Sequence, residues 1–169
     1  MSIRAVAALG LAALVSTACG SSSHAPAQPK MATRPVMRAI AQTIKRQHDI
    51  STVVVCPAAP KKKAGYRFTC LAKLAVGSYP VEVVETNAHG GVRYSNGTPL
   101  RLLNSHTVEL AIQRAVDAQR RLKATVACPS PILQRAGLVF TCTVRTRRGS
   151  SRFRVTEANS RGRVTFVGL

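Results

Sequence analysis

The sequence has no tryptophan, and aromatic residues make up only 4% of its 169 residues. Any hydrophobic core must therefore be aliphatic. Acidic residues are also scarce, with six Asp and Glu against 25 Lys and Arg and a formal net charge of +19. Such a charge indicates anionic partners (lipid, polymer or nucleic acid) and does not specify a fold. Only one apolar run could engage a membrane, which excludes a multi-span protein, whereas 46% hydrophobic residues exclude a wholly disordered chain.

Residues 1–18 are predicted to be a signal peptide. Arg4 supplies the positive start, and the apolar stretch from Ala5 to Val15 is shorter than the roughly 20 residues of a membrane span but suits a signal core. The small residues before Cys19 resemble a bacterial lipoprotein signal, in which the cysteine thiol receives diacylglycerol and becomes the mature N-terminus. An ordinary secretory signal with a stray cysteine is the alternative, since Ser16 stands where lipoprotein signals prefer leucine.

Residues 19–32 are predicted to be the lipidated cysteine and a flexible tether rich in Ser, Pro and Ala, with a reach on the order of 20 Å. The lipoprotein resemblance implies a protein anchored on the outer face of the cell membrane. The chain has five cysteines, and an odd number in an exported protein leaves one thiol to explain. Lipidation of Cys19 accounts for it and leaves four cysteines in a compartment where disulfides persist.

The remainder of the chain is an internal duplication with an offset of 72. Between positions 36 and 95, 19 of the 60 residues are identical 72 residues later. The predicted organisation is a first repeat at 33–95, a linker at 96–106 and a second repeat at 107–169. Each repeat opens with apolar residues at helical spacing and continues with four β-rich runs. Thr33 and Ser105 are the predicted helix N-caps.

The predicted fold class is α+β, with two tandem modules that each pack one helix on a four-stranded antiparallel sheet and contain one internal disulfide. A two-residue turn at Gly149-Ser150 is expected to place Val144 opposite Val155, and in the first repeat Ala72 opposite Val83. Side chains alternate between the two faces of a strand, so Phe68 and every second residue along its strand, such as Cys70, face the core.

The four remaining cysteines are predicted to pair within each repeat, because only this pairing is local and respects the duplication. The predicted disulfides are Cys56–Cys70 and Cys128–Cys142. Each would stabilise a module of about 60 residues, a size that buries little apolar surface. A zinc site is the rival interpretation, but it requires closer cysteine pairs or clustered histidines.

The repeated motif also resembles a known family. Cys56-Pro57, Ala64-Gly65, Phe68-x-Cys70, Gly77 and Asn87-x-x-Gly90 are similar to the framework of the domain of unknown function 4333, and Cys128-Pro129, Gly137, Phe140, Cys142, Gly149 and Gly162 repeat it. That family is common in actinobacterial lipoproteins and membrane proteins. The resemblance supports the disulfides and the exported location, and it implies no activity.

Few residues of the sequence are candidates for a catalytic or ligand-binding role. Glu85 and Glu157 recur at equivalent strand ends with core-facing parity, where each is either a site carboxylate or, as we favour, a rim carboxylate bonded to a turn or a nearby Arg. No second carboxylate or base lies nearby for acid–base catalysis, and no G-x-S-x-G motif is present. We therefore expect no enzyme activity, catalytic residue, metal or cofactor. Nucleic acid is a disfavoured partner because stacking aromatics are lacking.

Arginines distinguish the second repeat from the first. Arg145, Arg147, Arg152 and Arg154 are predicted on the hairpin face opposite the core, where the first repeat has Lys73, Ala75, Pro80 and Glu82. Like charges paired across strands are destabilising, which suggests an anionic polymer or lipid headgroup that compensates them. General arginine enrichment with screening by salt is the alternative explanation.

These features predict a lipid-anchored binding or interaction module of the cell envelope that contacts anionic envelope polymer or lipid. The alternative is a structural or regulatory subunit that docks on a membrane or envelope protein.

Overall fold

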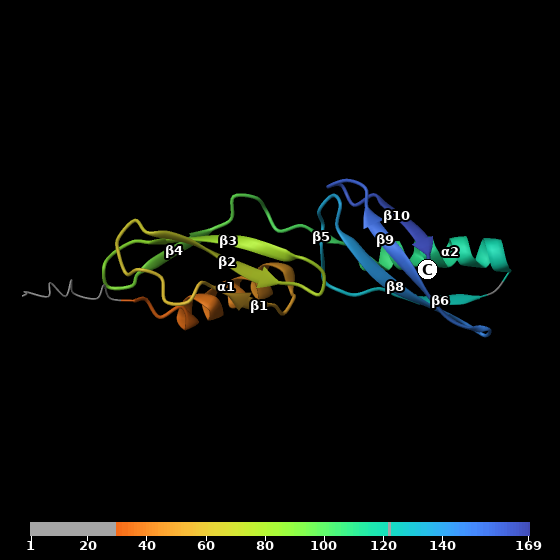
Figure 1. Ribbon diagram of the computed structural model, residues 1–169, viewed down its shortest axis with the longest axis horizontal. Helices are drawn as coiled ribbons and strands as arrows, with labels where there is room; N and C mark the ends of the chain where they lie inside the picture. The colour runs from red at the N-terminus through yellow and green to blue at the C-terminus, as the bar shows by residue number, and fades with distance from the viewer. Residues whose placement is uncertain (1–29, 122) are drawn as a thin grey trace, which may run out of the picture.

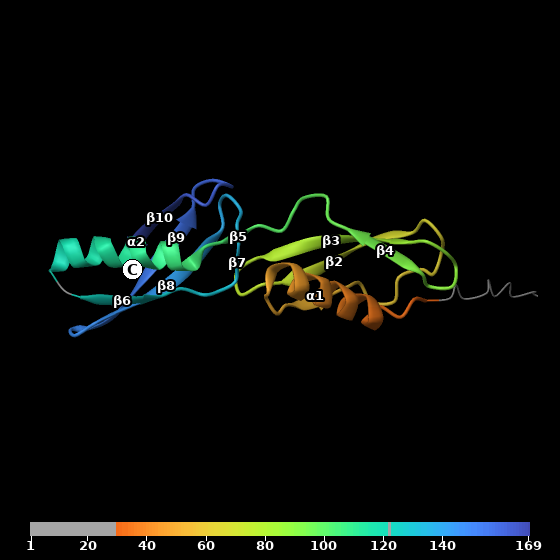
Figure 2. The same ribbon diagram turned by 180° about the vertical axis from the view of Figure 1, so that it is seen from behind.

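The computed structural model describes residues 30–121 and 123–169, which form an elongated molecule with two modules lying end to end (Figure 1). The predicted signal peptide at 1–18, Cys19 and the tether up to residue 29 lie outside the described residues. The fold is α+β with antiparallel sheets, as predicted. Each helix lies against one face of its own sheet, which is visible from both sides of the molecule (Figures 1 and 2).

The first module combines one helix with an antiparallel sheet of strand order β1-β2-β3-β4. Its elements are α1 (Arg34–His48), β1 (Val53–Val55), β2 (Arg67–Lys73), β3 (Ser78–Glu85) and β4 (Val92–Ser95).

The second module repeats this arrangement with the strand order β10-β9-β8-β6, and a separate two-stranded sheet pairs β5 with β7. The elements are β5 (Leu102–Leu103), α2 (Ser105–Arg120), β6 (Ala124–Ala127), β7 (Ile132–Leu133), β8 (Val139–Thr146), β9 (Gly149–Glu157) and β10 (Val164–Gly168). The β5–β7 sheet was not predicted.

Both helices bury the apolar stripe that the sequence spacing predicts. The most deeply buried helical residues are Val36, Ile40 and Ile44 in α1 and Val108, Ile112 and Val116 in α2. They pack on the inner faces of the sheets, where Phe68, Phe140 and their neighbours along the strands are also buried. Each module thus has a small aliphatic core between one helix and one sheet.

Both predicted disulfides are present, Cys56–Cys70 and Cys128–Cys142, each with a sequence separation of 14. Cys70 and Cys142 are fully buried in the two cores. Closing a loop of this length stabilises each small module by about 3 kcal/mol in the entropic description.

The hairpin register differs from the prediction. In the second module the turn residues are Arg147-Arg148, not Gly149-Ser150, and Val144 faces Ser151 instead of Val155. The partner therefore moves by four positions along the opposite strand. Because four is an even number, every side chain keeps its predicted face.

The glycine after each hairpin turn explains why the predicted register was wrong. Gly149 has a φ of 132° and the equivalent Gly77 a φ of 88°, and each follows the two turn residues of its hairpin. In three-residue hairpin loops a residue with positive φ follows a two-residue turn and begins the returning strand. In the first module Ala72 accordingly pairs with Tyr79, not with Val83.

Part of the segment 96–106 is regular structure, because β5 pairs with β7 and α2 begins at Ser105. The N-cap of α2 is Asn104, whose side chain accepts a hydrogen bond of 3.1 Å from the backbone N–H of Thr107. The prediction of Ser105 as the cap is therefore wrong by one residue. Thr33 caps α1 by position, without a side-chain hydrogen bond.

The modules are joined by backbone hydrogen bonds as well as by the chain. Val76, in the β2–β3 turn, lies beside Ile132 in a parallel bridge. Its N–H donates to Pro131 O over 3.2 Å, and its carbonyl accepts from Leu133 N–H over 2.9 Å. Leu133 belongs to the hydrophobic cluster of the first module, while Val76 packs against that of the second. Side chains that belong to the two hydrophobic clusters therefore lie next to each other at the junction.

Replacing Gly77 with alanine should weaken this junction. A Cβ at Gly77 would lie 2.9 Å from the Cβ of Leu133, whereas a Cβ at Gly149 would meet no atom within 4 Å. Both glycines have positive φ, so Gly149→Ala controls for backbone strain alone. We expect Gly77→Ala to lower the free energy of unfolding by about 1–3 kcal/mol more than Gly149→Ala. We also expect faster hydrogen exchange at Leu133 N–H in Gly77→Ala only; equal effects would contradict this account of the junction.

Candidate functional site

Three arginines lie on the outer face of the second sheet, opposite the face that packs on α2. Arg145 on β8 and Arg152 and Arg154 on β9 are all exposed, and they alternate with core residues such as Val144 and Val155. We call these three residues the arginine face. Arg147 was predicted to belong with them, but it occupies the turn between β8 and β9.

The observed register separates the charges across strands. Arg152 lies opposite Thr143, Arg154 opposite Thr141 and Arg145 opposite Ser150. The expectation that arginines pair directly with one another is therefore wrong, and the repulsion it implied is reduced to that between diagonal neighbours. The sheet can therefore fold without a compensating ligand. The guanidinium groups of the arginine face remain available to bind an anion.

No acidic side chain of the second module is available to neutralise this face, because each is committed to a backbone N–H. Glu109 accepts from Cys128 N–H over 2.8 Å, and Asp117 accepts from Ala124 N–H over 2.9 Å. Glu157 is buried at the end of β9. Among the described residues, none of the three arginines forms an ion pair. The arginine face is thus an uncompensated cationic surface.

The corresponding face of the first sheet is chemically different. Val53 on β1 is 69% exposed, and Leu71 on β2, 38% exposed, lies opposite the exposed Val55. The charges there are partly compensated, since Arg67 pairs with Glu82. This face therefore has an apolar strip, which Val53 and Val55 of the edge strand β1 form with Leu71 of β2.

The two repeated glutamates are structural acceptors rather than a solvent-facing site. Glu85 and Glu157 are each only 1% exposed. Oε2 of Glu85 accepts from Lys63 N–H over 2.7 Å, and Oε2 of Glu157 accepts from Arg135 N–H over 2.9 Å. Each carboxylate therefore anchors the loop that its module's disulfide closes. They bond to backbone, as favoured from the sequence, but they are buried and do not lie at the rim.

Burial raises the pKa of Glu157 above its ordinary value of 4.5. The hydrogen bond from Arg135 N–H and the positive charge of Arg135 act in the opposite direction, but desolvation of the carboxylate dominates. Oε1 of this carboxylate has no hydrogen-bond partner, which is consistent with a poorly solvated charge.

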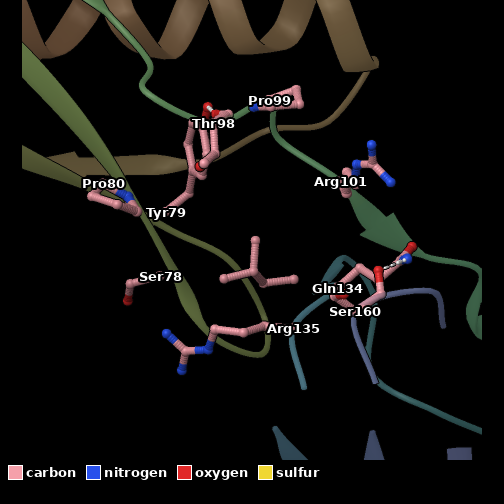
Figure 3. Close-up of a pocket in the computed structure, with 10 residues that line it drawn as sticks. Ser78, Tyr79, Pro80, Thr98, Pro99, Arg101, Gln134, Arg135 and Ser160 are labelled. Atoms are coloured by element: carbon pink, nitrogen blue, oxygen red, sulfur yellow. Dashed lines mark hydrogen bonds between the residues drawn. The ribbon is translucent and has the colours of Figure 1, made fainter. Parts of the chain in front are cut away.

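A groove lies where the modules meet and has a volume of about 550 Å³ (Figure 3). Its residues come from the start of β3, the segment before β5, the end of β7 with the two residues after it, and the loop before β10. They are Ser78, Tyr79, Pro80, Thr98, Pro99, Arg101, Leu133, Gln134, Arg135 and Ser160. The sequence prediction did not include this groove, because its walls come from segments far apart in the chain that only the junction brings together.

Each module also has a smaller cleft beside the start of its helix, with volumes of about 380 and 290 Å³. Both clefts use the same nine positions of the repeat, offset by 72. The first is lined by Met31, Ala32, Pro35, Val36, Ala39, Lys62, His89, Gly90 and Val92, and the second by Leu103, Asn104, Thr107, Val108, Ala111, Gln134, Arg161, Gly162 and Val164, together with Leu102. The duplication therefore extends to the surface shape of the modules.

Over residues 30–121 and 123–169, no group of three or more His, Cys, Asp or Glu side chains is placed to hold a metal ion. No helix in the same ranges is long and apolar enough to cross a membrane.

Comparisons of the chain with protein-family models, curated proteins and solved structures find no match.

The raised pKa of Glu157 predicts a pH-dependent stability. The folded protein binds the proton more tightly than the unfolded chain, so this carboxyl contributes stability below about pH 4.5 that is lost as the pH rises through the folded-state pKa. Glu157→Gln, which keeps an acceptor for Arg135 N–H, should flatten the fall in unfolding free energy between pH 4.5 and neutrality.

Glu157→Ala is the matched comparison, because it removes the acceptor and leaves the part-buried N–H of Arg135 without this partner. It should lower stability at every pH by about 1–3 kcal/mol. Denaturant titrations across this pH range test both variants. A Gln variant that retains the wild-type pH dependence would show that Glu157 is not its source.

Proposed function

We propose that this protein is a lipid-anchored binding module of the cell envelope that contacts anionic envelope polymer or lipid headgroups through the arginine face. The observation that carries the proposal is that Arg145, Arg152 and Arg154 are exposed on one sheet face and have no acidic partner among the residues that the structure describes. The two repeats are proposed to be tandem copies of the domain of unknown function 4333, on the strength of the shared Cys-Pro, Phe-x-Cys and glycine positions.

The anchor and the surface would act together. Lipid on Cys19 and a tether with a reach on the order of 20 Å keep the folded modules close to the outer face of the membrane. Diacylglycerol on Cys19 would bring two acyl chains, which anchor a protein stably. A basic side chain near an anionic membrane contributes about 1 kcal/mol, so the three arginines would hold the second module against the surface to which the lipid tethers it.

Docking on an envelope or membrane protein is the second candidate function, and the apolar strip of the first sheet favours it. Val53, Val55 and Leu71 are exposed together on β1 and β2, and a sheet edge with apolar neighbours is suited to protein contacts. Salt separates the two functions. Contacts with an anionic surface weaken as salt screens the charges, whereas apolar docking does not.

Charge reversal on the arginine face should abolish most binding to an anionic surface. A soluble form beginning at Ser21 retains both cores and both disulfides, since all of these lie within the described residues. Its Arg145→Glu/Arg152→Glu/Arg154→Glu variant should bind phosphatidylglycerol-containing vesicles about a hundredfold more weakly, because three contacts of about 1 kcal/mol are lost. Vesicle co-sedimentation at increasing salt measures the effect.

The matched control reverses three exposed arginines on the helices, Arg34, Arg38 and Arg114, which changes the net charge equally. The control should lose much less binding, and both variants should show wild-type thermal transitions. Equal losses would mean that net charge alone attracts the protein and that the arginine face is not a site.

Replacing Cys19 with serine should release the protein from the membrane. Serine has no thiol to acylate, so the variant expressed in the native host is expected in the soluble fraction, while the wild-type protein stays in the membrane fraction. Fractionation after a high-salt wash separates lipid anchoring from electrostatic adhesion. A variant that remains with the membrane after the wash would contradict the anchor assignment.

A further inference from the structure

The groove between the modules has the form of a small-molecule site. Its volume of about 550 Å³ lies within the roughly 300–1,000 Å³ of known ligand pockets, and such pockets occur preferentially at interfaces between domains. We propose that it binds a small organic anion with an apolar body, namely a carboxylate or phosphate carried on a hydrocarbon group. This proposal goes beyond the proposed envelope contact and shares no residue with the arginine face.

Several lining residues are apolar and would contact the hydrocarbon group of the ligand. Leu133 and the buried Tyr79 belong to the first module's hydrophobic cluster and border the groove, and the two prolines Pro80 and Pro99 flank it. Figure 3 shows Tyr79 and Pro80 on one side of the groove and Thr98 and Pro99 next to them. An apolar ligand group placed here would bury its own surface together with the exposed surface of Pro80 and Pro99.

Two arginines would bind the anionic group of the ligand. Arg101 and Arg135 lie on different sides of the groove (Figure 3), and both are exposed. None of the described residues that line the groove is acidic. Within the described ranges neither forms an ion pair. The charge of Arg135 is felt by Glu157, but that carboxylate is buried and bonds the backbone N–H of Arg135. A guanidinium group binds carboxylates and phosphates through charge-assisted hydrogen bonds.

The walls of the groove are held in place by hydrogen bonds between segments. Tyr79 donates its hydroxyl hydrogen to Thr98 O over 2.6 Å, which fixes the segment before β5 on β3. Gln134 N–H donates to Arg101 O over 2.9 Å, and the Gln134 side chain donates to Ser160 O over 2.7 Å. Walls that hydrogen bonds hold in place lower the entropic cost of binding.

The groove also depends on the tandem arrangement. One wall of the groove contains Ser78–Pro80 of the first module, and the other contains Leu133, Gln134 and Arg135 of the second. Arg101 comes from the segment before β5. The groove therefore forms at the junction of the two repeats, and neither module contains it alone.

Octanoate is the primary probe, titrated into the soluble form beginning at Ser21 and followed by calorimetry and by the methyl NMR signals of Leu133. Octyl phosphate tests the phosphate head found in lipids, and its affinity relative to octanoate identifies the preferred anionic group. Acetate has the charge without the apolar body, and octanamide has the body without the charge. Octanoate or octyl phosphate should bind and shift the Leu133 signals, while acetate and octanamide should bind at least about tenfold more weakly.

The Arg101→Gln/Arg135→Gln variant should reduce the affinity about tenfold or more, because charge-assisted hydrogen bonds are lost. Arg38→Gln/Arg114→Gln, on exposed helical positions, should leave it unchanged. Thr98→Trp should block the groove from its exposed rim while the Thr98 carbonyl still accepts from Tyr79. Wild-type affinity in the groove variants, or shifts that map away from Leu133, would overturn the proposal, whereas the triple variant of the arginine face should still bind octanoate.

Discussion

The backbone pairing around Val76 is the contact on which the arrangement of this molecule depends. Two hydrogen bonds join Val76 in the turn of the first hairpin to Pro131 and to Leu133 of β7, and the side chains on either side extend both cores to the junction. Gly77 permits this approach because it has no Cβ to meet Leu133. The relative position of the modules, and with it the groove between them, follows from this contact. A flexible linker alone would leave the modules free to move and would form no shared wall.

The residues that make this contact are not repeated at the equivalent positions of the other module. Arg147-Arg148 in the second hairpin correspond to Ala75-Val76, and Lys61–Lys63 in the first module correspond to Leu133–Arg135. A contact between the arginine turn and the lysine loop would bring like charges together, which is unfavourable. The junction contact is therefore specific to the first hairpin and the β7 region.

The scarcity of acidic residues connects stability with surface charge. In the second module each carboxylate accepts from a backbone N–H at a loop or strand end, and this use stabilises the fold. The arginines on the outer sheet face are consequently left without partners. Because the few carboxylates of the second module bond to its own backbone, the module presents a cationic surface. This surface lies on the sheet face that does not pack on α2.

The sequence by itself determined the duplication, the helix stripes, the disulfide pairs and the face of each strand residue, because these depend on spacing along the chain: an offset of 72, a period of 3.6 or an alternation of two. It could also place Glu85 and Glu157 on the core side of a strand. The tertiary structure decided the hairpin register, since a glycine with positive φ can stand within a turn or directly after it. It also decided the β5–β7 sheet and the groove with Arg101 and Arg135, because these form only when segments distant in the chain meet, and no local period records which segments will pack together.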